Sequence, residues 1–179
     1  MDSPLPSLYL VGLVVLLAIL SIVVGIQVWK VRRDEATLQR LQQEIGDRKV
    51  ADPVKLYELG SVQLRKRLFP QAVTTLGEAV QRAGREPREG QALIHNALGY
   101  ALAAQKQHTE AIRHYRKALE AKPDYPVALN NLGHALEQQQ RQKEAAKAYA
   151  QTLALDAGNA IAKRRLQRLE KAQASTLDQ

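Results

Sequence analysis

The strongest hydrophobic feature of the chain is an uncharged run of 21 residues from Leu8 to Val28, broken only by small or mildly polar residues. An α-helix of this length, rising 1.5 Å per residue, spans about 31 Å, close to the roughly 30 Å hydrocarbon core of a bilayer. Tyr9 and Trp29 lie at its two ends, where amphipathic rings favour the headgroup level. The pattern therefore predicts a single transmembrane helix within residues 1–29.

After residue 50 the hydrophobic positions adopt the three- and four-residue spacings of amphipathic helices. One pattern occupies residues 92–125 and returns 34 positions later in residues 126–159. Its marks are Leu98, Gly99, Leu102, Ala111, Tyr115, Ala118 and Pro123, and then Leu132, Gly133, Leu136, Ala145, Tyr149, Thr152 and Ala157. This period and signature resemble the tetratricopeptide repeat (TPR), a helix-turn-helix unit.

A third and more divergent copy precedes these two, offset by 39 residues instead of 34. The additional residues fall within Arg85–Gln91 and predict a lengthened loop between repeats, which costs little entropy. Glycine inside a helix costs about 1 kcal/mol relative to alanine, so its return at one repeat position predicts close helix packing. The marks of this copy are Leu59, Gly60, Ala72, Leu76 and Ala79.

Helical patterns also flank the repeats. Residues 30–52 have apolar positions on one side and predict a helical stalk, which either continues from the membrane or folds onto the first repeat; Gly46 and Asp47 are candidates for its end. Asp52 before Pro53 predicts a helix start. Residues 160–173 carry Ala162, Leu166 and Leu169 on one face and basic residues elsewhere, as expected of a capping helix.

These patterns predict an all-α protein with one N-terminal transmembrane helix, a TPR α-solenoid of three helix-turn-helix repeats and a C-terminal capping helix. The expected divisions are the tail and membrane helix (1–29), the stalk (30–52), the repeats (53–159, at about 53–86, 92–125 and 126–159), the capping helix (160–173) and a disordered tail (174–179).

Charge orients the predicted membrane helix. The chain has a net charge of +8, and its basic residues all follow Trp29. Lys30, Arg32 and Arg33 flank the apolar run, and positive flanks stay on the cytoplasmic side, so the N-terminus is expected outside, or in the lumen, and the repeats in the cytoplasm or stroma. A cleaved signal peptide is disfavoured because it requires a positive N-terminal region and a shorter apolar core.

Residue chemistry argues against catalysis. The chain has no cysteine, and His95, His108, His114 and His134 lie at no recognised metal-ligand spacing, so no metal, cofactor or catalytic residue is predicted. His95 occupies a position filled by leucine in the other repeats and is expected to pack. The basic residues between 163 and 171 could attract anionic lipid or nucleic acid, but a solvated face is favoured, and no nucleic acid is expected because interleaved aromatic residues are missing.

Binding is the remaining class of function, and the repeat resemblance implies where it occurs. The first helix of each unit in TPR proteins lines a concave groove. A carboxylate clamp is disfavoured because Tyr57 and Ser61 stand where lysine and asparagine are needed. Asn96 and Asn130 correspond by the 34-residue shift, and each side-chain amide can donate a hydrogen bond to a peptide backbone and accept one from it. Asparagine before Leu-Gly is, however, also ordinary in the repeat consensus. The groove positions are Tyr57, Ser61, Leu64, Arg65, Asn96, Tyr100, Ala103, Asn130, His134, Glu137 and Gln138.

The whole layout is more specific than the repeats. A short acidic tail (residues 1–4), one membrane helix, a Trp-Lys-x-Arg-Arg flank from Trp29 to Arg33, a stalk and three capped repeats resemble the membrane-anchored TPR proteins of cyanobacteria and plastids that assist photosystem I assembly. The resemblance implies a non-catalytic thylakoid scaffold that binds photosystem I subunits or assembly intermediates.

Two other functions are consistent with the same residues. One is a generic bacterial membrane-anchored adaptor or co-chaperone in envelope biogenesis or secretion, which differs in its partner. The other is a secreted or periplasmic binding protein, which requires the opposite topology. The sequence leaves the oligomeric state open.

Overall fold

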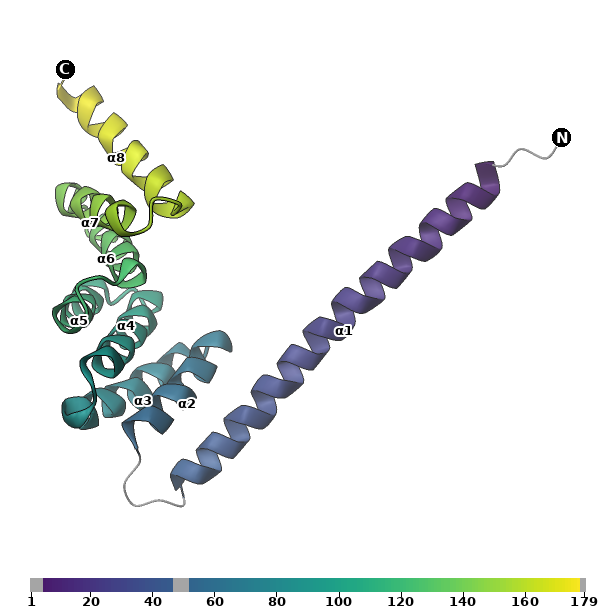
Figure 1. Ribbon diagram of the computed structural model, residues 1–179, viewed down its shortest axis with the longest axis horizontal. Coiled ribbons are helices and arrows are strands. Elements are labelled where there is room, and N and C mark those ends of the chain that lie inside the picture. The colour runs from purple at the N-terminus through teal and green to yellow at the C-terminus, as the bar shows by residue number, and fades with distance from the viewer. Residues whose placement is uncertain (1–4, 47–51, 178–179) are drawn as a thin grey trace.

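The computed structural model describes residues 5–46 and 52–177, which form eight α-helices, one short 3-10 helix and no strand. One long helix extends away from a curved stack of shorter ones (Figure 1). The all-α prediction is confirmed. The predicted acidic tail at residues 1–4, the Asp47 side of the predicted helix break and residues 178–179 of the predicted disordered tail lie outside the described residues.

Helix α1 (Leu5–Gly46) joins the predicted membrane helix and stalk in one unbroken element. Its large hydrophobic side chains between Tyr9 and Val28 are 47–74% exposed, and none is buried against another described part of the chain. A helix that is apolar all round needs an apolar environment, and α1 is long and apolar enough to cross a membrane.

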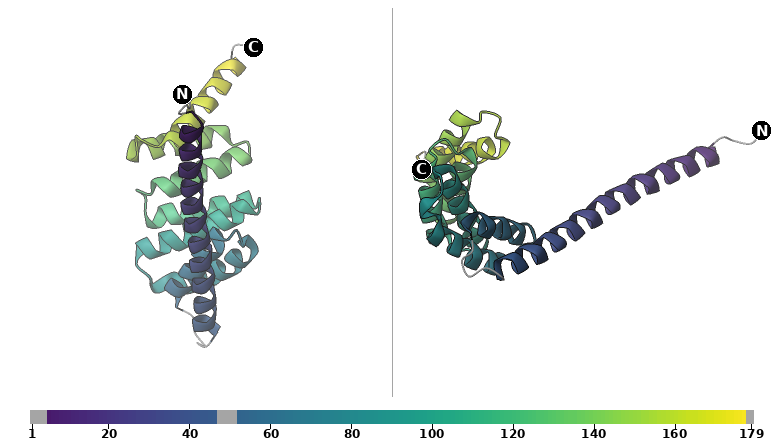
Figure 2. Two further views of the ribbon diagram at one scale, coloured as in Figure 1. Left: turned by 90° about the vertical axis from the view of Figure 1, so that its right-hand side faces the viewer. Right: turned by 60° about the horizontal axis from the view of Figure 1, so that its bottom comes forward.

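The remaining helices form three antiparallel pairs and a final single helix. In Figure 2 the pairs stack into a curved solenoid whose hollow side faces α1. The final helix, α8 (Ala160–Leu177), continues beyond residue 173, so residues 174–177 are helical where the sequence predicted disorder. The pairs are α2 (Pro53–Arg65) with α3 (Phe69–Arg82), α4 (Arg88–Ala104) with α5 (His108–Ala121), and α6 (Pro126–Gln138) with α7 (Gln142–Leu155).

The additional residues between the first two repeats do not lengthen a loop, so that prediction is wrong. A 3-10 helix, η1 (Ala83–Arg85), follows α3, and α4 begins at Arg88 and has 17 residues, against 13 in α2 and in α6. Pro87 is extended and sets the start of α4, since proline suits this end of a helix. An added helical turn satisfies its own backbone groups, which a longer loop would leave to solvent.

The glycines of the repeat signature mark the closest approaches between paired helices. A Cβ atom on Gly133 would lie 2.7 Å from Cε1 of Tyr149, and one on Gly99 would lie 2.7 Å from Cε1 of Tyr115. Both tyrosine side chains are fully buried. The close helix packing predicted at these glycines is therefore confirmed, and the group packed against each of the two is the tyrosine ring of the next helix.

The turn within each helical pair has the same backbone form. Arg67, Lys106 and Gln140 have φ angles of 59°, 64° and 60°, the left-handed region in which residues other than glycine are uncommon. The next amide then donates back to the first helix, as from Gln107 N to Leu102 O at 3.0 Å. Since these residues are spaced by the repeat offsets, the turn belongs to the repeat geometry.

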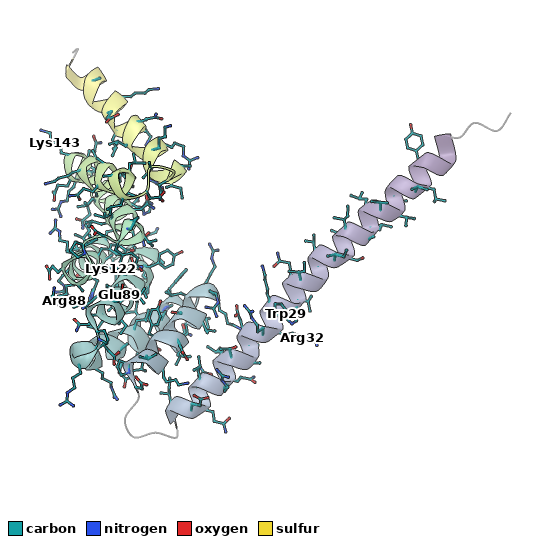
Figure 3. The ribbon with its side chains drawn as sticks, viewed as in Figure 1. Trp29, Arg32, Arg88, Glu89, Lys122 and Lys143 are labelled. Carbon is teal, nitrogen blue, oxygen red and sulfur yellow. The ribbon has the colours of Figure 1, made fainter. Side chains whose placement is uncertain are left out.

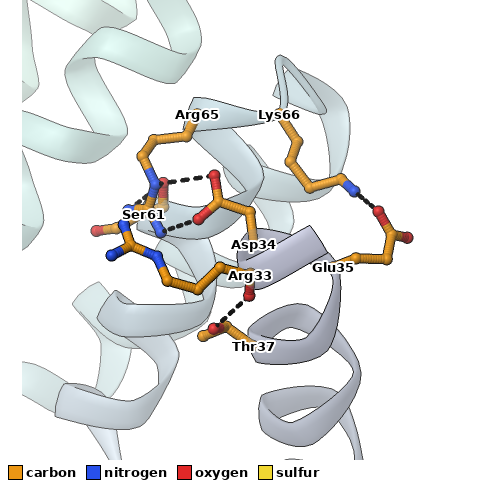
Figure 4. Close-up of polar contacts among 7 residues, drawn as sticks. All are labelled: Arg33, Asp34, Glu35, Thr37, Ser61, Arg65 and Lys66. Carbon is orange, nitrogen blue, oxygen red and sulfur yellow. Dashed lines mark hydrogen bonds and ion pairs between the residues drawn. The ribbon is translucent and has the colours of Figure 1, made fainter. Parts of the chain in front are cut away.

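The last part of α1 packs on the first repeat. Leu38 and Leu41 form a buried apolar cluster with Leu59 and Val62 of α2. Figure 4 shows two ion pairs beside this cluster, each joining an acidic residue of α1 to a basic residue near the end of α2. The stalk therefore both continues from the apolar segment and folds onto the first repeat, the two alternatives that the sequence left open. The pairs are Asp34 with Arg65, at 3.1 Å, and Glu35 with Lys66.

The predicted start of the repeat region is built as expected. The Asp52 side chain accepts a hydrogen bond from the Val54 amide at 3.0 Å, and Pro53 occupies the first turn of α2. An aspartate cap satisfies an amide that the helix itself cannot, and proline has no amide to satisfy. The register of the first repeat is therefore fixed by local chemistry.

Candidate protein-binding groove

The inner side of the solenoid is formed by the first helix of each pair. In Figures 1 and 2, α2, α4 and α6 lie on the side that faces α1, and α3, α5 and α7 lie on the outer side. Tyr57 and Ser61 are four residues apart on α2, so they share one helix face. The same spacing separates Asn96 from Tyr100 on α4 and Asn130 from His134 on α6.

This face also carries a row of exposed aliphatic residues that the sequence analysis did not single out. Val54, Leu93 and Val127 are 45%, 41% and 54% exposed, and each lies three residues before a predicted groove residue of its helix. Ile161 of α8 continues the row at 51%. The signal in the sequence was an aliphatic residue recurring at the 39- and 34-residue repeat offsets. We call these four residues the apolar ladder.

Tyr100 adds an aromatic ring to this face. Its side chain is 48% exposed and lies two turns along α4 from Leu93. Tyrosine offers a large rigid contact area together with a hydroxyl group, which makes it common at protein interfaces. The inner face thus combines apolar contacts with hydrogen-bonding groups, the combination that binds a polypeptide segment.

The two predicted asparagines differ in their hydrogen bonding. Asn96 donates to the hydroxyl of Tyr125 at 3.3 Å and accepts from Asn131 at 3.1 Å, so its amide already has partners within the chain. Asn130 has a buried Oδ1 atom with no hydrogen-bond partner among the described residues. This atom is enclosed by the fold, so a ligand in the groove does not reach it in this arrangement, and the groove assignment of Asn130 stays a prediction.

Glu137, at the end of the inner face, is bound by other side chains of the protein. Its side chain is only 7% exposed and accepts from the Tyr149 hydroxyl at 2.7 Å, from Arg165 at 2.6 Å and from Arg168. Burial would raise the pKa of Glu137, but these hydrogen bonds outweigh it and lower the pKa. Glu137 therefore ties α8 to the last repeat, while its neighbour Gln138 is exposed.

Arg65 belongs to the junction with α1. Its guanidinium group pairs with Asp34 and donates to the Ser61 carbonyl at 3.5 Å. The hydrogen bond from Arg65 holds the pKa of Asp34 below its ordinary value, against a smaller opposing effect of burial. Leu64 and Ala103, two other predicted groove residues, are partly buried and pack against the core.

The histidines form one close pair. Nδ1 of His95 and Nδ1 of His114 lie 3.0 Å apart on α4 and α5, so one ring donates and the other accepts. Burial, followed by the neighbouring His95, lowers the pKa of His114 to about 4. Burial also lowers the pKa of His134, with a further contribution from Arg165. No group of three or more potential metal ligands occurs in the described part of the chain.

The paired helices, glycine-marked contacts and inner face define a TPR protein. Family models agree, since a TPR repeat model matches residues 99–140 and a tetratricopeptide repeat model matches residues 128–161. The ycf37 protein of Guillardia theta is 32% identical over 93% of this chain and 93% of its own length. That of Cyanophora paradoxa is 32% identical over 95% and 98%. The chain belongs to the ycf37 family.

One further relative and two solved structures widen the comparison. The tetratricopeptide repeat domain-containing protein PYG7, chloroplastic, of Arabidopsis thaliana is 30% identical over 88% of this chain and 52% of its own length. Among solved structures, MamA matches 76% of this chain and 77% of its own with a TM-score of 0.70 at 18% identity. The first TPR domain of Spaghetti (RPAP3), solved with an HSP90 peptide, covers 68% and 93% with a TM-score of 0.63 at 20% identity. These structural likenesses establish the fold.

Proposed function

We propose that this protein is a thylakoid scaffold that holds photosystem I subunits or assembly intermediates in the inner groove of its repeats. The observation that carries the proposal is the apolar ladder with Tyr100, an exposed binding face on a chain whose relatives include ycf37 proteins and a chloroplastic TPR protein. A chain of this family with such a face is suited to hold polypeptide.

The inner face favours an extended or helical segment with apolar side chains at intervals. Successive ladder residues come from successive helices, so a ligand that lies across them meets one aliphatic side chain per repeat. Gln138, which is exposed, offers hydrogen bonds beside that row. The HSP90 peptide bound to the RPAP3 domain is a precedent for a peptide ligand on this fold.

The membrane anchor supports a role in assembly at the bilayer. With α1 in the thylakoid membrane and Lys30, Arg32 and Arg33 on its cytoplasmic or stromal side, the repeats lie where newly inserted subunits present their soluble segments. Confining both partners to one surface layer raises their effective concentration, so modest affinity in the groove is sufficient.

Gene replacement in a photosynthetic host tests the proposal. We expect deletion to lower photosystem I content, and the unaltered gene to restore it. A groove variant with Leu93→Ser, Tyr100→Ala and Val127→Ser should fail to restore it although it accumulates in the membrane. The matched control is Lys143→Ala on α7, on the side of the solenoid turned away from α1 (Figure 3), which should restore it.

Affinity capture separates this proposal from other partners. The unaltered protein should retain photosystem I subunits from solubilised membranes, and the groove variant should lose them. Capture of envelope or secretion proteins, together with unchanged photosystem I content in the deletion strain, would contradict the proposal and favour a general bacterial adaptor. Protease treatment of vesicles of known sidedness should cleave the repeats only from the cytoplasmic or stromal side.

A further inference from the structure

We propose that α8 is a second membrane contact, which binds the anionic lipid headgroups of the bilayer that α1 spans. The proposal rests on the membrane anchoring in the proposed function but is independent of the partner. Its occupant is a lipid surface, and its binding groups are basic side chains on the outward face of α8: Lys163, Arg164, Arg168 and Lys171.

The outward face of α8 has more positive charge than the solenoid uses. Arg165 and Arg168 reach Glu137, although Arg168 keeps 66% of its side chain exposed. Lys163, Arg164 and Lys171 are exposed and form no ion pair within the described residues. Acidic residues are few on this helix, where Glu170 is the one described acidic residue. The face is therefore an uncompensated cationic surface.

The packing of α8 determines where this surface points. Ala162 and Leu169 are buried and join the core. Arg164 follows Ala162 by two residues, and Lys171 follows Leu169 by two residues. Each residue turns the helix by about 100°, so both basic residues lie about 200° round, on the opposite side of the helix. The basic face is therefore turned away from α7, the helix on which α8 packs.

The fold brings this face to the level of the membrane. Figure 1 shows the solenoid rising beside α1, so that α8 is the helix farthest from the α1–α2 junction and lies across the direction of α1. Figure 2 shows α8 on the same side of the junction as the apolar half of α1. The bilayer lies across α1, and its surface begins near Trp29 and Arg32, labelled midway along α1 in Figure 3. A helix that lies across α1 at that end of the solenoid runs along the lipid surface.

The junction between α1 and the repeats keeps this arrangement in place. The Leu38 and Leu41 cluster and the ion pairs of Asp34 and Glu35 hold the last part of α1 against α2. The stretch from Trp29 to Gly46 is about 27 Å long at 1.5 Å per residue, which gives the solenoid room between the junction and the bilayer surface. Two contacts then fix the orientation of the groove relative to the membrane.

A fluorescence experiment on the full-length protein tests this proposal. The chain has no cysteine, so single cysteines can be labelled with an environment-sensitive dye. The two matched sites are Gln167→Cys on α8 and Gln81→Cys on α3, both exposed glutamines. Each labelled protein is reconstituted into phosphatidylcholine vesicles with or without phosphatidylglycerol, and resistance of α1 to alkaline extraction confirms insertion.

We expect the emission of the label at position 167 to shift to the blue only in vesicles with phosphatidylglycerol, and the label at position 81 to stay unchanged. Salt should reverse the shift because it screens exposed charges. Arg164→Glu with Lys171→Glu should abolish it, because each basic residue near an anionic surface changes the docked population about fivefold.

Three contrary results are distinguishable. Insertion of α1 without any lipid-dependent shift at position 167 would overturn the contact of α8 and leave the proposed scaffold intact. Failure of α1 to insert would contradict the membrane anchoring itself. A shift that survives the double charge reversal would also overturn the proposal, since the basic face would then not be its cause.

Discussion

The two ends of the solenoid are both covered by a helix, but by different forces. At the N-terminal end, α1 buries leucines against α2, and its ion pairs with Arg65 and Lys66 lie at the surface. At the C-terminal end, Ala162 and Leu169 are the buried residues of α8 among those described, and Leu166 packs beside them. The nearly buried carboxylate of Glu137 joins α8 to α6 and α7. The first end depends on apolar burial and the second on electrostatics.

This difference matches what each end has to do. In the proposed function, α1 transmits the position of a membrane to the repeats, and apolar packing is insensitive to salt and to charge on the bilayer. The helix α8 presents cations to its surroundings, and the one carboxylate that holds it also neutralises part of that charge. A cap built this way should respond to ionic conditions more strongly than the junction at α1, where the ion pairs are exposed and buried leucines provide the main contact.

The largest effect is expected at the apolar end. Leu41 is 1% exposed, so Leu41→Ala should lower the free energy of unfolding of the α1–α2 junction by about 2–5 kcal/mol. Hydrogen exchange of α2 amides in detergent-solubilised protein measures this. Leu41→Met keeps the volume and should cost less than about 1.5 kcal/mol. Equal exchange in the alanine variant and the unaltered protein would show that α1 is not packed there.

A smaller effect is expected at the electrostatic end. Glu137→Gln keeps the shape but removes the charge that Arg165 and Arg168 contact, and should lower stability by about 1–3 kcal/mol. This loss of stability should be smaller than the loss on breaking a fully buried ion pair, because Arg168 is largely exposed. Urea unfolding measures the loss, with Glu170→Gln, an exposed residue of α8, as the control. A similar loss in both variants would contradict the role given to Glu137.

Acid should loosen the C-terminal end before the N-terminal junction. Hydrogen bonds lower the pKa of folded Glu137 below 4.5, against the effect of burial, so the unfolded chain binds the proton more readily. The stabilisation is then complete above pH 4.5 and is lost as the pH falls through the folded pKa. Hydrogen exchange of α8 as a function of pH measures it. Glu137→Gln should remove this part of the pH dependence; its persistence would point to another group.

The smallest effect is expected for the surface ion pair of the junction. Asp34→Asn should lower stability by less than about 1 kcal/mol, since Arg65 is 52% exposed and solvent screens the pair. The difference between the variant and the unaltered protein in urea unfolding should shrink further as salt is added. A loss as large as that of Leu41→Ala would show that charge, and not apolar burial, holds α1 to the repeats.

Most of the architecture was predictable because it depends on the spacing of residues that are close together in the sequence. The apolar run within α1, the aspartate cap before Pro53 and the glycine positions of the repeats each depend on neighbours in sequence. Gly133 illustrates this, because a repeated glycine within a helix indicates a close contact even before the contacting ring of Tyr149 is known. The insertion before Gln91 was misread because Pro87 and Gly90 suggest a loop equally well.

The candidate groove was only partly predictable. Repeat register and the resemblance to TPR proteins placed Asn96, Arg65 and Glu137 on the inner helices as groove residues. In the structure, those three side chains have partners from other helices, which no repeat consensus contains. The apolar ladder was missed for the converse reason, since an aliphatic residue on a helix is ordinarily assigned to the core and only its exposure distinguishes it.

The sequence by itself determined the helices, the repeat period and the apolar anchor, because each follows from interactions between residues a few positions apart. Only the tertiary structure decided which polar side chains hold the molecule together and which remain for a partner. It also decided that α8 lies on the same side of the α1–α2 junction as the apolar half of α1. The physical reason is that the curvature of the stack sums small rotations over all the repeats, and no local pattern encodes that sum.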